Sequence, residues 1–118
     1  MPFTKETPFI NLNFHINNKQ GSIIAGIQSL MYCWGMLYVD ILFVEEVYRH
    51  QQLGSLLLHK VEAEGKSMGA TLCHLDTFNF QAKDFYLKQG YEIFGILDDC
   101  PPGHQRYYLK KTYYDRYS

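Results

Sequence analysis

The sequence has little of what marks a nucleic-acid-binding or membrane-spanning protein. Its 118 residues carry 11 Lys and Arg against 12 Asp and Glu, a formal net charge of −1, with no block of one sign. Without a basic excess there is no general attraction to a phosphate backbone, so no nucleic-acid partner is expected. No apolar run approaches the ~18 residues that span a bilayer, and Met1 to Glu6 lead into no apolar segment of a signal peptide. We expect a cytoplasmic protein without a membrane partner.

Cysteine is also scarce, and it stands in no pattern typical of a metal site. Cys33, Cys73 and Cys100 are odd in number and widely spaced, which favours reduced thiols in a reducing compartment. No Cys-x-x-Cys or His-x-x-x-His spacing is present, so no metal site is predicted. Cys73 and His74 are adjacent on a predicted strand and point to opposite faces, which argues against a thiol nucleophile.

Apolar and aromatic side chains, by contrast, are abundant. Hydrophobic residues make up 47% of the chain, aromatic residues 16% and charged residues 19%, a composition that excludes intrinsic disorder. At this length folding removes roughly two-thirds of the surface of the extended chain. We therefore expect residues 1–118 to form a single domain with one core. The aromatic excess favours a sheet over a helical bundle.

Alternation of apolar and polar residues predicts several strands. The pattern covers 9–16, 22–31 and 36–44 in the first half of the chain, with turn residues over 17–21. Three strands in a row imply an antiparallel meander. A last hairpin is predicted from strands over 91–97 and 105–111.

Between these strands the period changes to that of a helix. Leu53, Leu57 and Val61 predict a helix of about four turns that stops at Gly69. Its exposed side is expected to carry Lys60, Glu62, Glu64 and Lys66. A strand over 70–77 follows, so 36–44 and 70–77 should pair in parallel through a right-handed βαβ crossover.

A second short helix is predicted over 81–89, with Asn79 near its N-cap and Gly90 at its end. The fold class is therefore α/β, with a mixed and mostly antiparallel sheet.

The loop before the long helix is the expected place for an anionic ligand. A helix start exposes unpaired N–H groups and about half a positive charge, which suits a phosphate or pyrophosphate. Gly54 would let the backbone approach such a ligand closely, and Arg49 could add a charged contact. A plain turn that uses Gly54 for its dihedral angles is the alternative.

Two segments resemble signatures of the GNAT superfamily of acyl-CoA-dependent N-acyltransferases. The first matches the pyrophosphate loop Gln/Arg-x-x-Gly-x-Gly/Ala at Arg49, Gln52 and Gly54, with Gln52 where the family usually has Gly. The second, over 79–91, matches Asn-x-x-Ala-x-x-Phe-Tyr-x-x-x-Gly-Phe except that Tyr91 replaces the last Phe. Both occur in the family's order and separation, and the resemblance covers roughly residues 9–111.

The resemblance implies a GNAT-like sheet whose two parallel strands splay apart at their carboxyl ends. Acetyl-CoA is the implied cosubstrate, with its pantetheine arm in the gap and its diphosphate on the loop. The implied cofactor-binding residues are Leu42, Phe43, Val44, Arg49, Gln51, Gln52, Leu53, Gly54, Ser55, Asn79 and Tyr86. For Asn79 a plain N-cap is the alternative.

The implied reaction is direct transfer of the acetyl group from acetyl-CoA to a small or peptidic primary amine. An ammonium with a pKa near 10.4 costs about 4.6 kcal/mol to deprotonate at pH 7, so a base or a water chain must take the proton. Asp40 and Asp76 are the candidates, and a structural acceptor is the alternative for each. Tyr86 matches the family's Tyr and is the predicted donor to the leaving thiolate. The alternative for Tyr86 is a buried core ring.

The start of the chain departs from the family. Family members usually begin with a further strand and one or two helices that form much of the acceptor pocket, whereas only residues 1–8 precede the first strand predicted here. We expect one of three explanations: a minimal version of the domain, a reading frame that lost its start, or a second subunit that fills the gap. Because an uncovered strand edge and apolar face favour association, we predict a homodimer. The alternative function is a non-catalytic acyl-CoA-binding or dimerisation module with a degenerate acceptor site.

Overall fold

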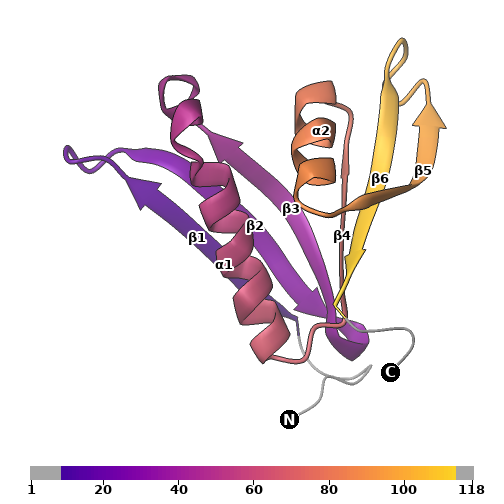
Figure 1. Ribbon diagram of the computed structural model, residues 1–118, viewed down its shortest axis with the longest axis horizontal. Coiled ribbons are helices and arrows are strands. Elements are labelled where there is room, and N and C mark those ends of the chain that lie inside the picture. The colour runs from indigo at the N-terminus through magenta and orange to yellow at the C-terminus, as the bar shows by residue number, and fades with distance from the viewer. Residues whose placement is uncertain (1–8, 114–118) are drawn as a thin grey trace.

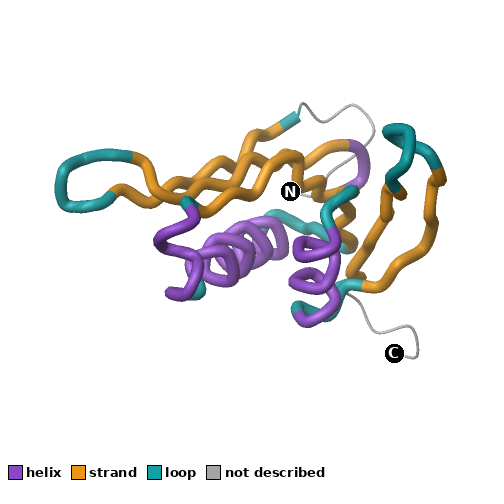
Figure 2. Tube along the Cα trace, turned by 90° about the horizontal axis from the view of Figure 1, so that it is seen from above, coloured by secondary structure: helices purple, strands orange, loops and turns teal. Residues whose placement is uncertain are grey.

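The computed structural model describes residues 9–113, which form a six-stranded sheet with both helices on one face (Figures 1 and 2). The strands are β1 (Ile10–Asn17), β2 (Ile23–Tyr32), β3 (Met36–Val44), β4 (Leu72–Thr77), β5 (Glu92–Asp98) and β6 (Gln105–Thr112). The helices are α1 (Leu53–Ser67) and α2 (Phe80–Lys88), with 3-10 turns η1 (Cys33–Gly35) and η2 (Glu46–Gln51). Met1 to Glu6, assessed above for a signal peptide, lie outside the described residues.

The sheet is mixed, with strand order β1-β2-β3-β4-β6-β5. The predicted meander is confirmed, since β2 pairs antiparallel with both β1 and β3. The predicted parallel pair of β3 and β4, joined through α1, is confirmed as well. β6 lies between β4 and β5 and runs antiparallel to both. The α/β class predicted from the sequence is therefore correct. The two 3-10 turns were not predicted, because segments this short show no hydrophobic period.

The parallel strands β3 and β4 are paired only near their starts. The register runs from Met36↔Leu72 to Tyr38↔His74, and the described strands have no further pair beyond it. Toward their carboxyl ends each strand stays paired on its outer side only, β3 with β2 as far as Val44 and β4 with β6 as far as Thr77. The two strands therefore diverge from Val39 onward, as Figure 1 shows, and one edge of β3 is left without a strand partner.

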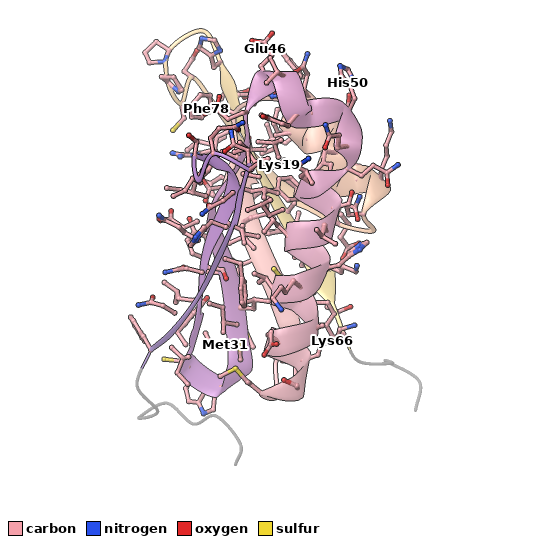
Figure 3. All side chains as sticks on the ribbon, turned by 90° about the vertical axis from the view of Figure 1, so that its left-hand side faces the viewer. Lys19, Met31, Glu46, His50, Lys66 and Phe78 are labelled. Atoms are coloured by element: carbon pink, nitrogen blue, oxygen red, sulfur yellow. The ribbon has the colours of Figure 1, made fainter. Side chains whose placement is uncertain are left out.

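The divergent end of the sheet is the end at which α1 begins. In Figure 3, Glu46 and His50 of η2 and Phe78 after β4 lie at this end, whereas Met31 and Lys66 lie at the other. The buried stripe of α1, which includes Leu57, Leu58 and Val61, packs on the sheet. Among the described helices, none has the length and hydropathy that a membrane span requires.

Glu62 corrects one expectation from the helical pattern. It was expected on the exposed side of α1, but it is buried, with 4% of its surface accessible. Its Oε2 accepts hydrogen bonds from the hydroxyls of Tyr91 (3.1 Å) and Tyr113 (2.6 Å), and Lys111 Nζ lies 3.4 Å away. A carboxylate is tolerated inside a protein when it is paired and hydrogen-bonded in this way.

Candidate active site

A cavity of about 450 Å³ opens at the divergent end of the sheet, and we call it the main cavity. Its lining residues are Leu42, Phe43, Val44, Arg49, Gln52, Gly54, Ser55, Asn79, Gln81, Ala82, Phe85 and Tyr86. All predicted cofactor-binding residues line it except two. Gln51 is exposed at the end of η2, and the side chain of Leu53 packs against the core.

Three lining residues of α2, namely Gln81, Ala82 and Phe85, are not among those predicted from the sequence. Ala82 stands in the quoted motif, so it could have been named from the sequence. Phe85 lies three residues further along and so on the same side of the helix as Ala82. Gln81 has no signal in the sequence, because its position depends on how α2 is rotated against β4.

The first turn of α1 reaches the main cavity with uncapped amides. Among residues 9–113, the Gln52 side chain at the N-cap of this helix makes no capping hydrogen bond, and the first backbone hydrogen bond runs from Leu56 N to Gln52 O (3.1 Å). The N–H groups of Leu53, Gly54 and Ser55 therefore have no acceptor inside the helix. Together with the helix dipole they form an arrangement suited to a phosphate or diphosphate.

Arg49 adds a fixed positive charge beside these amides. Its Nε donates to the carbonyl oxygen of Val44 at 3.0 Å, which anchors the guanidinium to the end of β3. The other guanidinium donors remain for an anion in the main cavity. Since Glu45 N donates to Ile24 O, the alternate residue Phe43 also directs its backbone groups to β2. The backbone edge of β3 available to a ligand is therefore that of Leu42 and the amide of Val44, because Arg49 uses the Val44 carbonyl.

Asn79 caps α2. Its Oδ1 accepts hydrogen bonds from the amides of Gln81 (2.8 Å) and Ala82 (3.1 Å), as the N-cap alternative predicted. Since Asn79 also lines the main cavity, capping and contact with a ligand do not exclude each other.

A second cavity of about 220 Å³ lies in the opening between β3 and β4, and we call it the wedge cavity. Its lining residues are Val39, Asp40, Ile41, Leu42, Leu75, Asp76, Thr77, Ala82 and Tyr86. It shares Leu42, Ala82 and Tyr86 with the main cavity. Asp76 alternates with the core residue Leu75 and so points to the face without helices.

Tyr86 stands where the two cavities meet. It is buried, and its ring packs edge-on against Phe85 (5.2 Å between centroids) and Tyr91 (5.6 Å). Burial, with a smaller effect of Cys73, raises the pKa of Tyr86 above its ordinary value near 10. The hydroxyl is therefore protonated at neutral pH and can act as a hydrogen-bond donor. Tyr86 is thus both a core ring and a cavity residue.

The two candidate bases differ in their surroundings. The Oδ1 of Asp76 accepts a hydrogen bond from the hydroxyl of Tyr38 (3.1 Å), and its Oδ2 lies 2.8 Å from Arg106 Nε. Burial first, and then Asp76, raise the pKa of Tyr38 to about 12, so Tyr38 remains the donor in that bond. Asp40 lines the same cavity and is exposed.

The comparison with known proteins decides the family. Residues 11–93 match the family model described as an acetyltransferase (GNAT) domain. The chain belongs to the GNAT acetyltransferase family.

The relatives of this GNAT domain are named acetyltransferases. Blasticidin-S acetyltransferase of Streptomyces morookaense is 33% identical over 92 residues, which cover 77% of this chain and 64% of that protein. The chain thus spans less than two thirds of the length of that relative. The crystal structure of an acetyltransferase from Bacillus cereus matches with a TM-score of 0.85 and 37% identity over 92% of this chain and 77% of that chain.

A third match shows the shared fold. An aminoglycoside 6'-N-acetyltransferase, crystallised in complex with coenzyme A, has a TM-score of 0.78 and 18% identity, and covers 90% of this chain and 74% of that chain. The membership of the GNAT acetyltransferase family that the sequence predicted is confirmed by the family model and by these relatives.

The departure from the GNAT loop pattern at Gln52 has a structural cost. Gln52 adopts φ 57° and ψ 29°, in the left-handed region that favours glycine. Gly54, by contrast, is helical, and a Cβ there would lie 3.5 Å from Phe85 Cζ and 3.8 Å from Val44 Cγ2, ordinary contacts. The protein itself therefore does not require glycine at 54, and the missing Cβ leaves space in the main cavity beside the amides.

Other reactive side chains of this GNAT domain lie outside the cavities. Burial raises the pKa of the Cys73 thiol to about 12, so it is not a nucleophile at neutral pH. Burial lowers the pKa of His74, which hydrogen-bonds through Nε2 to the hydroxyl of Tyr32. Within residues 9–113, no group of three His, Cys, Asp or Glu side chains is arranged to hold a metal ion.

Proposed function

We propose that the protein is an N-acetyltransferase that moves the acetyl group of acetyl-CoA directly to a primary amine. The observation that carries this proposal is the meeting of two cavities at Tyr86, one of which contains the uncapped start of α1. A protein of the same fold holds coenzyme A in its crystal structure, which supports acetyl-CoA as the cosubstrate.

In this proposal acetyl-CoA occupies the main cavity. Its diphosphate is bound by the amides of residues 53–55 and by Arg49, whose charge complements the phosphates. The pantetheine arm pairs with the free backbone edge of β3 at Leu42 and Val44. The thioester then lies beside Tyr86.

The amine occupies the wedge cavity and attacks the thioester carbonyl. Deprotonating its ammonium costs about 4.6 kcal/mol at pH 7, and the exposed carboxylate of Asp40, directly or through water, accepts that proton. Asp76 is held by Tyr38 and Arg106 and shapes the cavity wall. Tyr86 donates a hydrogen bond to the leaving sulfur, which hinders the reverse attack. Transfer is direct, because Cys73 is buried and protonated.

The experiment that tests the function is a screen for thiol release from acetyl-CoA. The acceptors are small amines, including blasticidin S because a relative is named for it, and peptides with a free N-terminus. We expect at least one amine to release thiol at a rate that saturates with its concentration. A protein that acetyl-CoA stabilises against heat, but that releases no thiol with any amine, would instead be a binding module.

The same proposal includes a cytoplasmic homodimer without metal, nucleic-acid or membrane partners. β5 is an edge strand, and it carries Ile93, Phe94, Ile96 and Leu97 with between 37% and 54% of their surfaces exposed. An exposed apolar edge strand is typical of an interface. That residues 1–118 form one domain also stays a prediction.

A further inference from the structure

Gln89 links the helix that carries Tyr86 to the first turn of α1. Its Nε2 donates to Ser55 Oγ at 3.0 Å, and its Oε1 accepts from His59 Nε2 at 2.9 Å. Ser55 and His59 are four residues apart and therefore share one side of α1. A single carboxamide thus bridges α2 to α1.

The main-chain N–H and carbonyl of Gln89 also form hydrogen bonds. Its N–H donates to Tyr86 O at 3.0 Å, and its carbonyl accepts from Lys111 Nζ at 2.9 Å. Two consecutive contacts therefore connect the Ser55 hydroxyl to the backbone of Tyr86. Ser55 and Tyr86 both line the main cavity, whereas Gln89 does not.

The direction of the bond to Ser55 has a chemical consequence. A serine hydroxyl has one proton and two lone pairs. Because the Gln89 amide donates to Oγ, it occupies a lone pair and leaves the hydroxyl proton for another acceptor. Ser55 is the third residue of α1, so its hydroxyl lies beside the uncapped amides.

We propose that Gln89 is a positioning residue that turns the Ser55 hydroxyl into a donor to a phosphate oxygen of the cosubstrate and fixes that hydroxyl relative to Tyr86. This inference rests on the proposed function, because it requires a diphosphate at the start of α1. A phosphate oxygen is a strong acceptor, and hydrogen bonds to charged groups are stronger than neutral ones.

The decisive variant is Gln89→Glu. A carboxylate has nearly the same shape and still accepts from His59, but it cannot donate to Ser55. The carboxylate instead accepts a hydrogen bond from the Ser55 hydroxyl, so that hydroxyl can no longer donate to a phosphate. It also adds a negative charge near the diphosphate. We expect the Kd of CoA to rise about ten-fold or more.

A donor without a diphosphate separates this role from a structural one. With acetyl-pantetheine in place of acetyl-CoA, kcat/KM of Gln89→Glu should stay within about two-fold of the wild-type value, while kcat/KM for acetyl-CoA falls about ten-fold. Lys88→Gln is the matched control, because it makes the same change in charge at the adjacent, exposed residue. In this control the ratio of kcat/KM for acetyl-CoA to kcat/KM for acetyl-pantetheine should equal that of the wild type.

The inference would be overturned if Gln89→Glu lowered kcat/KM equally for acetyl-CoA and acetyl-pantetheine, or if it left the Kd of CoA unchanged. If Gln89→Glu does not fold, Ser55→Ala, Gln89→Met and their double variant are measured instead. Their losses in CoA affinity should be non-additive, since each removes the same interaction, and additive losses would also overturn the inference. If wild-type protein binds no CoA, the proposed function itself fails. If wild-type protein binds CoA but Gln89→Glu leaves the ratio of kcat/KM for the two acetyl donors unchanged, only the inference about Gln89 fails.

Discussion

At the scale of single residues, Tyr86 distinguishes an acetyltransferase from a protein that only binds acetyl-CoA. Tyr86→Phe removes the hydroxyl and keeps the ring between Phe85 and Tyr91. We expect kcat for thiol release to fall about 10²-fold, because a positioned proton donor contributes at least that much, while the Kd of CoA stays within about two-fold. An unchanged kcat would show that the hydroxyl has no part in the reaction.

The pH dependence of Tyr86 follows from its burial. A buried hydroxyl whose pKa is raised keeps its proton up to a higher pH than a free tyrosine, so its contribution is complete below pH 10 and is lost only above the raised pKa. We expect kcat to show no decline caused by Tyr86 between pH 7 and 10. An alkaline decline with an apparent pKa below 10 that disappears in Tyr86→Phe would contradict the assignment.

Gln52 is strained, and its replacement should stabilise the protein. A non-glycine residue in the left-handed region destabilises the folded state by about 1–2 kcal/mol. Glycine removes this strain, but its greater conformational freedom in the unfolded chain offsets part of the gain. Gln52→Gly should therefore raise the free energy of unfolding by ~0.5–1 kcal/mol, measured by urea denaturation. Gln51→Gly, one residue earlier and without a positive φ, is the control and should lower stability. If both variants lower the free energy of unfolding, the backbone conformation of Gln52 does not destabilise the protein.

At the scale of elements, the start of α1 can be tested through Gly54. Gly54→Ala should stabilise the helix by ~0.5–1 kcal/mol, because alanine has the higher helix propensity and its Cβ makes only ordinary contacts. The same Cβ would fill space beside the amides and weaken CoA binding. The melting temperature without ligand and the Kd of CoA should therefore both rise, because the variant is more stable but binds CoA more weakly. A rise in stability with an unchanged Kd would place the diphosphate elsewhere.

The elements were largely predictable from the sequence, because alternation and helical spacing reflect which faces are buried. Glu62 shows the limit of that reasoning, since its partners Tyr91, Tyr113 and Lys111 come from distant segments of the chain. The same limit applies to the site. The resemblance to the family predicted most of the main cavity, but Gln81 depends on the rotation of α2, and the bridge of Gln89 depends on the contact between two helices.

At the scale of the whole molecule, the apolar edge strand β5 predicts self-association. Light scattering at micromolar concentration should give about twice the chain mass of 13.9 kDa. Phe94→Lys, which places a charge at an exposed position of β5, should shift the mass toward that of a monomer, because charges on an edge strand oppose pairing. A wild-type monomer would contradict the homodimer.

The three residues shared by the two cavities also bear on the kinetics. The two cavities share Leu42, Ala82 and Tyr86 in their linings and otherwise have different walls, so the proposed function gives acetyl-CoA and the amine separate places. In the proposed reaction neither reactant has to depart before its co-reactant arrives, so we expect both to be bound at once. Double-reciprocal plots of initial velocity at several fixed amine concentrations should accordingly intersect, whereas a parallel family of lines would indicate an acetylated enzyme.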